Sequence, residues 1–167
     1  MQAFTAARTP ELIFGAERIT ELGRTLKERG ARTIVVVVSR SACADDDTRE
    51  GMLRMLADAG LQAWFYRYDR MPGDSDPFTA PRGGFLEASP RVVDAIAADL
   101  GSRQPDAVVA FGGGSAIDTG KALSVALVEE GSIRDYLEGV GAREPSGRRT
   151  PLVAIPTTAG TGSEATK

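Results

Sequence analysis

"VVAFGGGSAIDTGKA", residues 108–122, joins an apolar run to a helix-like run through three consecutive glycines. The apolar run predicts a buried strand, and the small or apolar residues at Ala116, Gly120 and Leu123 recur at helical spacing. Glycines let the backbone approach a ligand closely, and the N–H groups at a helix N-terminus attract anions. The spacing is neither G-x-G-x-x-G nor the P-loop pattern, so a purely structural tight turn remains an alternative. The candidate phosphate-binding residues here are Gly112, Gly113, Gly114 and Ser115.

The rest of the chain alternates short apolar runs with segments of helical periodicity. Strands are expected at residues 33–38, 62–68, 106–111 and 151–156, and helices at 17–30, 48–60 and 133–137. Ser89 and Pro90 suit the N-cap and first position of another helix, which continues to Leu100. This alternation predicts an α/β fold, a Rossmann-like, doubly wound, mainly parallel sheet with helices on both faces. Residues 1–167 would form one domain, with polar loops at 69–88 and 139–150.

A second loop rich in glycine and hydroxyl groups follows the last expected strand. "IPTTAGTGSEATK", residues 155–167, offers several hydroxyl side chains interleaved with two glycines. Carboxyl ends of parallel strands share one edge of a sheet, so this loop and the glycine turn should meet there. Two such loops suit a polyanion such as a pyrophosphate. The candidate residues of this loop are Thr157, Thr158, Gly160 and Thr161.

Composition excludes several classes of function. The chain has 20 basic and 23 acidic residues, which argues against nucleic acid as a partner. The apolar run at 34–38 is far too short to cross a membrane, and the first ten residues lack the apolar core of a secretory signal. A single cysteine, Cys43, is expected to be inert and fits a reducing cytoplasm. The acidic run 45–47 precedes a helix, where capping is favoured over metal binding.

The absence of histidine restricts the chemistry further. Histidine is the usual metal ligand and the usual general base near neutral pH. Any chemistry in which this chain takes part must therefore use other groups or groups of another chain.

The two motifs together lead to a known family. "GGGSAIDTGKA" with "IPTTAGTGSE" resembles the iron-dependent (group III) alcohol dehydrogenases, and the resemblance extends back to "FGAERITELGRTLKERGAR", residues 14–32. Dehydroquinate synthases and glycerol dehydrogenases share the glycine turn but differ in the threonine loop. Maleylacetate reductases also look similar, but their loop lacks the sequence "AGTGSE". The resemblance implies an N-terminal NAD(P)-binding domain, followed in complete members by a helical domain that holds the metal.

The resemblance also implies roles for individual residues. The glycine turn and Ser115 would hold the pyrophosphate through backbone N–H groups, and Asp118 would lie toward the nicotinamide and substrate. The threonines of the second loop would contact the phosphates and the nicotinamide ribose. Lys121 is either structural or a neutralising charge for phosphate, and Glu164 is expected to be a buried charge that supports its loop.

Three departures from the family pattern carry consequences. Ser39 stands where members usually place an aspartate for the adenosine ribose, and Arg40 follows it, which favours NADP over NAD. Ser89 replaces the usual asparagine near the cofactor. The family's iron is held by an aspartate and three histidines beyond the threonine loop, so a chain that stops at Lys167 without histidine is expected to be truncated and inactive alone.

For the complete enzyme the resemblance implies hydride transfer between an alcohol or aldehyde and NAD(P), with Fe²⁺ polarising the alcohol oxygen. It also implies a homodimer that associates near residues 11–15. A lyase or glycerol dehydrogenase-like enzyme and a non-catalytic nucleotide-binding module remain the alternatives.

Overall fold

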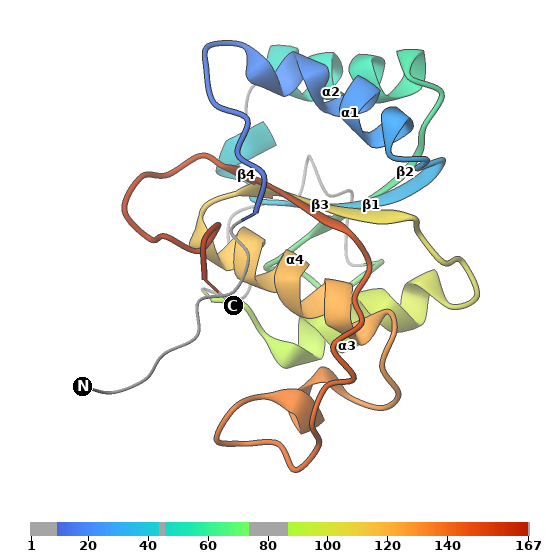
Figure 1. The fold of residues 1–167 in the computed structure, drawn as a ribbon, viewed down its shortest axis with the longest axis vertical. Coiled ribbons are helices and arrows are strands. Elements are labelled where there is room, and N and C mark those ends of the chain that lie inside the picture. The colour runs from blue at the N-terminus through green and yellow to red at the C-terminus, as the bar shows by residue number, and fades with distance from the viewer. Residues whose placement is uncertain (1–9, 44–45, 74–86, 167) are drawn as a thin grey trace.

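The computed structural model describes residues 10–43, 46–73 and 87–166. Its centre is a sheet of four parallel strands in the order β2-β1-β3-β4 (Figure 1). The strands are β1 (Thr33–Val38), β2 (Gln62–Arg67), β3 (Ala107–Gly112) and β4 (Leu152–Pro156). The expected α/β fold with a parallel sheet is confirmed, and each strand lies within a residue of its predicted bounds.

Helices cover both faces of this sheet (Figure 1). On one face lie α1 (Leu22–Glu28) and α2 (Asp46–Asp58), and on the other lie α3 (Pro90–Leu100) and α4 (Gly114–Ala126). Three short 3-10 helices accompany them: η1 (Arg18–Glu21), η2 (Ser41–Cys43) and η3 (Ile133–Tyr136). No helix among the described residues is long and apolar enough to span a membrane.

Two helix predictions need correction. The helix expected over 17–30 begins as the 3-10 turn η1, because Glu17 has a left-handed backbone with φ of 59° and cannot belong to an α-helix. The segment near residue 133 forms only a 3-10 turn, η3, in which the Ser132 hydroxyl accepts a hydrogen bond from the Arg134 N–H. In η1 the Thr20 N–H donates to the Glu17 carbonyl three residues earlier, at 3.0 Å, and α1 continues directly from this turn.

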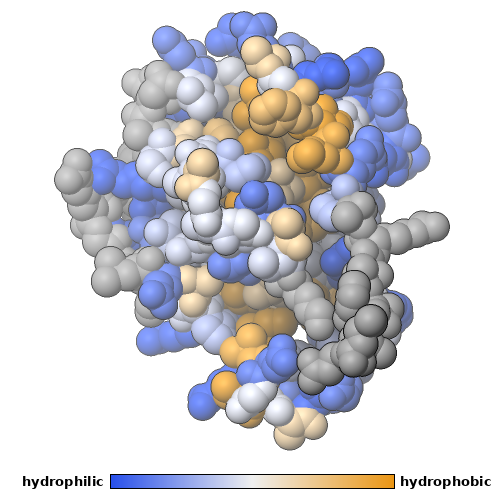
Figure 2. Space-filling model, turned by 60° about the vertical axis from the view of Figure 1, so that its left-hand side comes forward, coloured by the Kyte–Doolittle hydropathy of each residue, from blue (hydrophilic) through white to orange (hydrophobic). Residues whose placement is uncertain are grey.

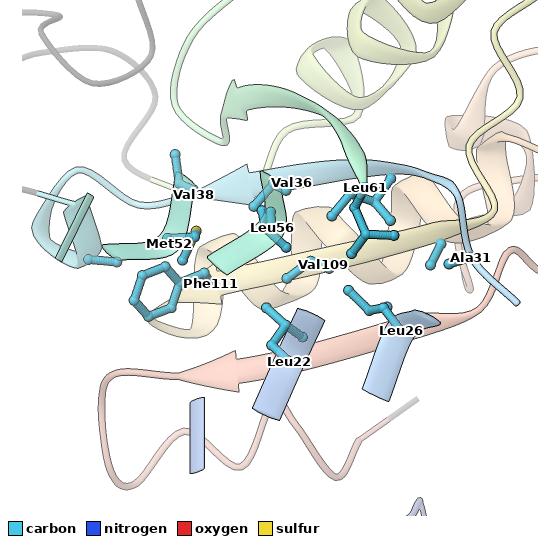
Figure 3. Packing of buried hydrophobic residues seen from close by; sticks show 13 residues of the cluster. Leu22, Leu26, Ala31, Val36, Val38, Met52, Leu56, Leu61, Val109 and Phe111 are labelled. Carbon is cyan, nitrogen blue, oxygen red and sulfur yellow. The ribbon is translucent and has the colours of Figure 1, made fainter. Parts of the chain in front are cut away.

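The central strands are buried because side chains on both of their faces meet a helix layer. Every residue of β3, and all of β1 after Thr33, is buried. Alternate residues face opposite layers: Val36 and Val38 pack with Leu22 and Leu56 under α1 and α2 (Figure 3). Val35 and Val37 pack with the α3 and α4 side chains instead. Each fully buried aliphatic side chain contributes about 1.5–3 kcal/mol, so these two strands anchor the domain.

The order of the strands creates a switch point between β1 and β3. From β1 the chain crosses to β2 on one side, whereas from β3 it crosses to β4 on the other. The helices α2 and α4 therefore leave the carboxyl ends of β1 and β3 toward opposite faces. In doubly wound sheets ligands bind in the crevice that this divergence opens.

Helix α4 approaches the sheet unusually closely at Gly120. A Cβ on Gly120 would lie 2.6 Å from the Cβ of Ala110 on β3, and Ala116 one turn earlier is fully buried. The sequence predicts this close approach from the small residues on that helix face. The position of α4, and hence of its N-terminus, depends on it.

We expect Gly120→Ala to lower the free energy of unfolding by about 1–2 kcal/mol. The added methyl group would overpack the helix–sheet contact, and this cost exceeds the gain in helix propensity of about 0.5–1 kcal/mol. Chemical denaturation measures the change.

Gly51→Ala is the matched control. Gly51 also lies inside a helix, α2, but nothing lies within 4 Å of a Cβ built there. The same substitution should raise stability by about 0.5–1 kcal/mol at this site. Equal effects at the two positions would contradict the close approach of α4.

Asp106 ties the amino ends of β1 and β3 together. Its Oδ2 accepts hydrogen bonds from the N–H groups of Arg32 and Thr33, each at 2.8 Å, and from the Thr33 hydroxyl at 2.9 Å. The two backbone donors, that of Thr33 first, lower the pKa of the Asp106 carboxyl. The carboxylate therefore stabilises the fold above its unfolded-state pKa, and that contribution is lost as the pH falls through the lowered folded-state pKa.

Asp106→Asn should reduce the free energy of unfolding by about 1 kcal/mol at pH 7, because a neutral amide oxygen accepts weaker hydrogen bonds from the Arg32 and Thr33 N–H groups than a carboxylate does. The difference between wild type and variant should shrink as the pH falls from about 5 toward 3, because the wild-type carboxyl then becomes protonated. Urea titrations at several pH values test this. Asp58→Asn, at an exposed position, is the control and should change stability by less than about 0.5 kcal/mol at every pH.

Candidate functional site

The glycine turn leaves a set of backbone N–H groups open at the carboxyl edge of the sheet. Gly112 ends β3 with φ of +155°, and Gly113 is the N-cap of α4 with an ordinary φ of −77°. No side chain caps this helix, and Ser115 lies inside its first turn. The first N–H groups of a helix have no intrahelical acceptor. With no Cβ at positions 112–114, an anion can approach these groups closely.

The threonine loop lies against this turn. Gly112 pairs in register with Pro156, and the Thr157 N–H donates to the Gly112 carbonyl at 2.9 Å. A Cβ on Gly113 would lie 3.4 Å from the Thr158 side chain. The prediction that both loops meet at one edge of the sheet is confirmed (Figure 1).

The hydroxyl-bearing residues of that loop divide into exposed and buried ones. Thr157, Thr158 and Thr161 are exposed, whereas Ser163 is buried near Gly114. Gly160, between the threonines, is also exposed and has a φ of +113°. The exposed threonines therefore remain available to a ligand.

A polar network fastens the end of the loop to α4. Lys121 Nζ lies 3.2 Å from Asp118 Oδ1 and donates to the Thr166 hydroxyl at 2.8 Å. The Ser163 hydroxyl donates to Asp118 Oδ2 at 3.4 Å. Of the two alternatives for Lys121, these contacts support the structural one. Glu164 is exposed, so its predicted burial as a supporting charge is wrong.

The carboxyl end of β1 brings two further residues to the crevice. Ser39 is buried, its N–H donates to the Phe111 carbonyl at 3.0 Å, and its hydroxyl accepts from the Ala42 N–H at 3.2 Å. Arg40 next to it is exposed. Of the two, Arg40 is the residue open to a ligand.

Ser89 lies at the start of α3 and is half-buried. Its carbonyl accepts from the N–H groups of Val92 and Val93, but its hydroxyl makes no capping bond. Within the described residues, no hydrogen bond joins Ser89 to the glycine turn.

The sequence analysis missed a buried ion pair at the carboxyl end of β2. Arg67 donates to both carboxylate oxygens of Asp69, at 2.6 and 2.5 Å, and its side chain is only 2% exposed. Asp69 lies in the turn that follows β2, so the strand period gave no signal of this pair.

Some predictions fall on residues whose placement or side chains the structure does not describe. They concern residues 74–86 of the long polar loop, Asp45 of the acidic run and the side chain of Cys43.

The residues present do not fit an iron site. The sequence has no histidine. Across residues 10–43, 46–73 and 87–166, no group of three or more metal-ligating side chains comes together.

A separate groove of about 840 Å³ runs between α1 and α2. Residues of the glycine turn and the threonine loop do not line it; its walls include Ile19, Met52 and Met55. Figure 2 shows hydrophobic surface on the upper half of the molecule, where Figure 1 places α1 and α2. The candidate nucleotide site is thus distinct from this groove. It is identified from the order of the strands and from the backbone N–H groups at the start of α4.

Comparison with known proteins identifies the family. The model of the iron-containing alcohol dehydrogenases matches residues 82–167, which include the glycine turn and the threonine loop. The chain belongs to the iron-containing alcohol dehydrogenase family. This confirms the resemblance that the paired motifs carry.

Individual relatives extend the likeness over nearly the whole chain. The NAD-dependent methanol dehydrogenase of Bacillus methanolicus is 32% identical over 158 residues, which are 94% of this chain and 36% of that protein. The sulfoacetaldehyde reductase of Bifidobacterium kashiwanohense, solved in complex with NAD⁺, is 25% identical with a TM-score of 0.73. The match includes 99% of this chain and 39% of the reductase chain.

The NADH-dependent butanol dehydrogenase A of Thermotoga maritima has the same fold at 20% identity, with a TM-score of 0.76 over 97% of this chain and 36% of its own. The chain thus spans little more than a third of the length of these three proteins.

Gly112→Ala should lower the free energy of unfolding by about 2 kcal/mol or more. Its φ of +155° disfavours a side chain, and the new Cβ would lie 2.6 Å from the Ser39 hydroxyl oxygen. Thermal and urea unfolding measure the effect.

Gly113→Ala is the neighbouring control, because its φ is ordinary and the nearest atoms would be 3.4 Å away. It should cost less than about 1 kcal/mol. A tolerated Gly112→Ala would show that the turn is not constrained as described.

Proposed function

We propose that this chain is the nicotinamide nucleotide-binding part of an alcohol dehydrogenase that transfers hydride between an alcohol or aldehyde and NAD(P). The observation that carries the proposal is the meeting of the open α4 N-terminus with the threonine loop at the switch-point edge. Membership of the iron-containing alcohol dehydrogenase family supports it. The role of residues 1–167 as one NAD(P)-binding domain is part of this proposal.

The diphosphate of the coenzyme is assigned to the glycine turn. The N–H groups of Gly113, Gly114 and Ser115 would donate to its oxygens, and the positive end of the α4 dipole would favour the charge by about 0.3–1 kcal/mol. A Cβ at Gly112 would collide with Ser39, so the backbone can take this conformation only because the residue is glycine.

The threonine loop is assigned to the nicotinamide half. The exposed hydroxyls of Thr157, Thr158 and Thr161 can donate to phosphate and ribose oxygens, and Gly160 allows the loop to turn between them. Asp118 is placed on the substrate side of the helix, where its contacts with Lys121 and Ser163 hold the loop in place. When bound, the nicotinamide ring accepts or returns the hydride.

The residues of this chain bind and orient the coenzyme, and we assign none of them a catalytic step. The sequence has no histidine, and among the described residues no group of three metal-ligating side chains comes together.

Coenzyme choice is assigned to the end of β1, where we propose a preference for NADP over NAD. A carboxylate there would repel a 2′-phosphate, but the sequence has Ser39 and Arg40 instead. Arg40 is exposed, so its guanidinium can pair with that phosphate. Ser89, at the α3 N-terminus, is assigned a position near the coenzyme.

Arg40→Gln should weaken NADPH binding by about tenfold while changing NADH binding by less than about twofold, because a charged hydrogen bond is worth about 1.5–3 kcal/mol. Isothermal titration of the full-length protein with each nucleotide measures both constants. Arg54→Gln, an exposed arginine of α2 paired with Glu50, is the control and should change neither. A wild-type preference for NADH would overturn the assignment of Arg40.

We further propose a homodimer that associates through residues 11–15 and resides in the cytoplasm. Leu12 is 81% exposed and Phe14 is 89% exposed in this segment, which favours contact with another surface. The single cysteine is consistent with a reducing compartment.

A further inference from the structure

We infer that the Ser39 hydroxyl is a positioning residue that shapes the glycine turn, and that it does not contact the coenzyme. The sequence pattern suggests the opposite, because Ser39 stands at the position from which the family contacts the adenosine ribose. The effect of Ser39 on coenzyme binding rests on the proposed function, in which the glycine turn binds the coenzyme.

The Ser39 side chain already has partners inside the protein. The residue is 6% exposed. Its oxygen accepts from the Ala42 N–H at 3.2 Å and lies 3.2 Å from the Ser41 hydroxyl oxygen. These bonds fold the chain into η2 immediately after β1. A hydroxyl used in this way needs no ligand to satisfy it.

The same side chain packs directly on the glycine turn. A Cβ on Gly112 would lie 2.6 Å from Ser39 Oγ and 2.7 Å from Ser39 Cβ, so the two residues touch through the bare Cα of the glycine. The Ser39 N–H also bonds to the Phe111 carbonyl, one residue before the turn, at 3.0 Å. Ser39 therefore limits where Gly112 can sit.

The position of Gly112 in turn determines where the threonine loop begins. Its carbonyl accepts from the Thr157 N–H at 2.9 Å, so the start of the threonine loop follows the position of the glycine. A shift of Ser39 would move the glycine turn and the threonine loop together. Both segments are assigned to the coenzyme, so the effect should not distinguish one nucleotide from another.

Ser39→Ala tests this inference by removing the hydroxyl while retaining Cβ. In the full-length protein we expect the dissociation constants for NADH and NADPH to rise by the same factor, roughly fivefold for one lost hydrogen bond. Their ratio should stay at the wild-type value. Arg40→Gln, in contrast, should change the ratio.

Hydrogen exchange provides a readout that needs no nucleotide. The Thr157 amide should exchange faster in Ser39→Ala than in wild type, because its acceptor on Gly112 is less well held. Ser124→Ala is the matched control: Ser124 is also a buried serine, and its hydroxyl donates to the Lys121 carbonyl at 2.7 Å. It should leave Thr157 exchange unchanged.

The possible outcomes separate this inference from the proposed function. A changed NADPH-to-NADH ratio in Ser39→Ala would make Ser39 a ligand and overturn the inference, as would unchanged affinities together with unchanged Thr157 exchange. Wild-type protein that binds neither nucleotide would refute the proposed function, while the exchange comparison would still decide whether Ser39 positions the turn. Unfolding curves establish that each variant is folded at the temperature of the assay.

Discussion

The bare Cα of Gly112 is the contact on which the candidate site depends. A Cβ there would lie within 3 Å of both Ser39 and Ala116, so β1, β3 and α4 can meet only because the side chain is absent. The Gly112 carbonyl also holds the Thr157 N–H. One residue thus links the end of β1, the β3–α4 turn and the start of the threonine loop, three segments that are far apart in the sequence, and the proposed anion site depends on their being held together.

The rest of the domain keeps this junction rigid. The strands β1 and β3 lie in the middle of the sheet and are covered on both faces, so their carboxyl ends have little freedom. Helix α4 lies close to β3 at Gly120, which directs its N-terminus to the same edge. At the other end, Asp106 fixes the amino ends of the two strands. The sheet and its helices thus form a rigid core, and the loops proposed to bind the coenzyme lie at one edge of it.

The chemistry at that edge is divided among segments. The glycine turn offers backbone N–H groups, the threonine loop offers hydroxyls, and the end of β1 offers the guanidinium of Arg40. None of these is a base near neutral pH or an iron ligand, and the sequence has no histidine to supply either. These groups suit the proposed role of binding and orienting the coenzyme.

The sequence by itself determined the parallel sheet, the faces of its helices, the glycine turn and the edge where the threonine loop meets it. These features follow from local periodicity and from the rule that parallel strands end at one edge. Only the tertiary structure decided that Ser39 is buried while Arg40 is exposed, that Lys121 pairs with Asp118 and Thr166, and that Glu164 faces solvent. The physical reason is that burial and pairing depend on distances between segments remote in the chain, such as Ser39 and Gly112, which no local pattern encodes.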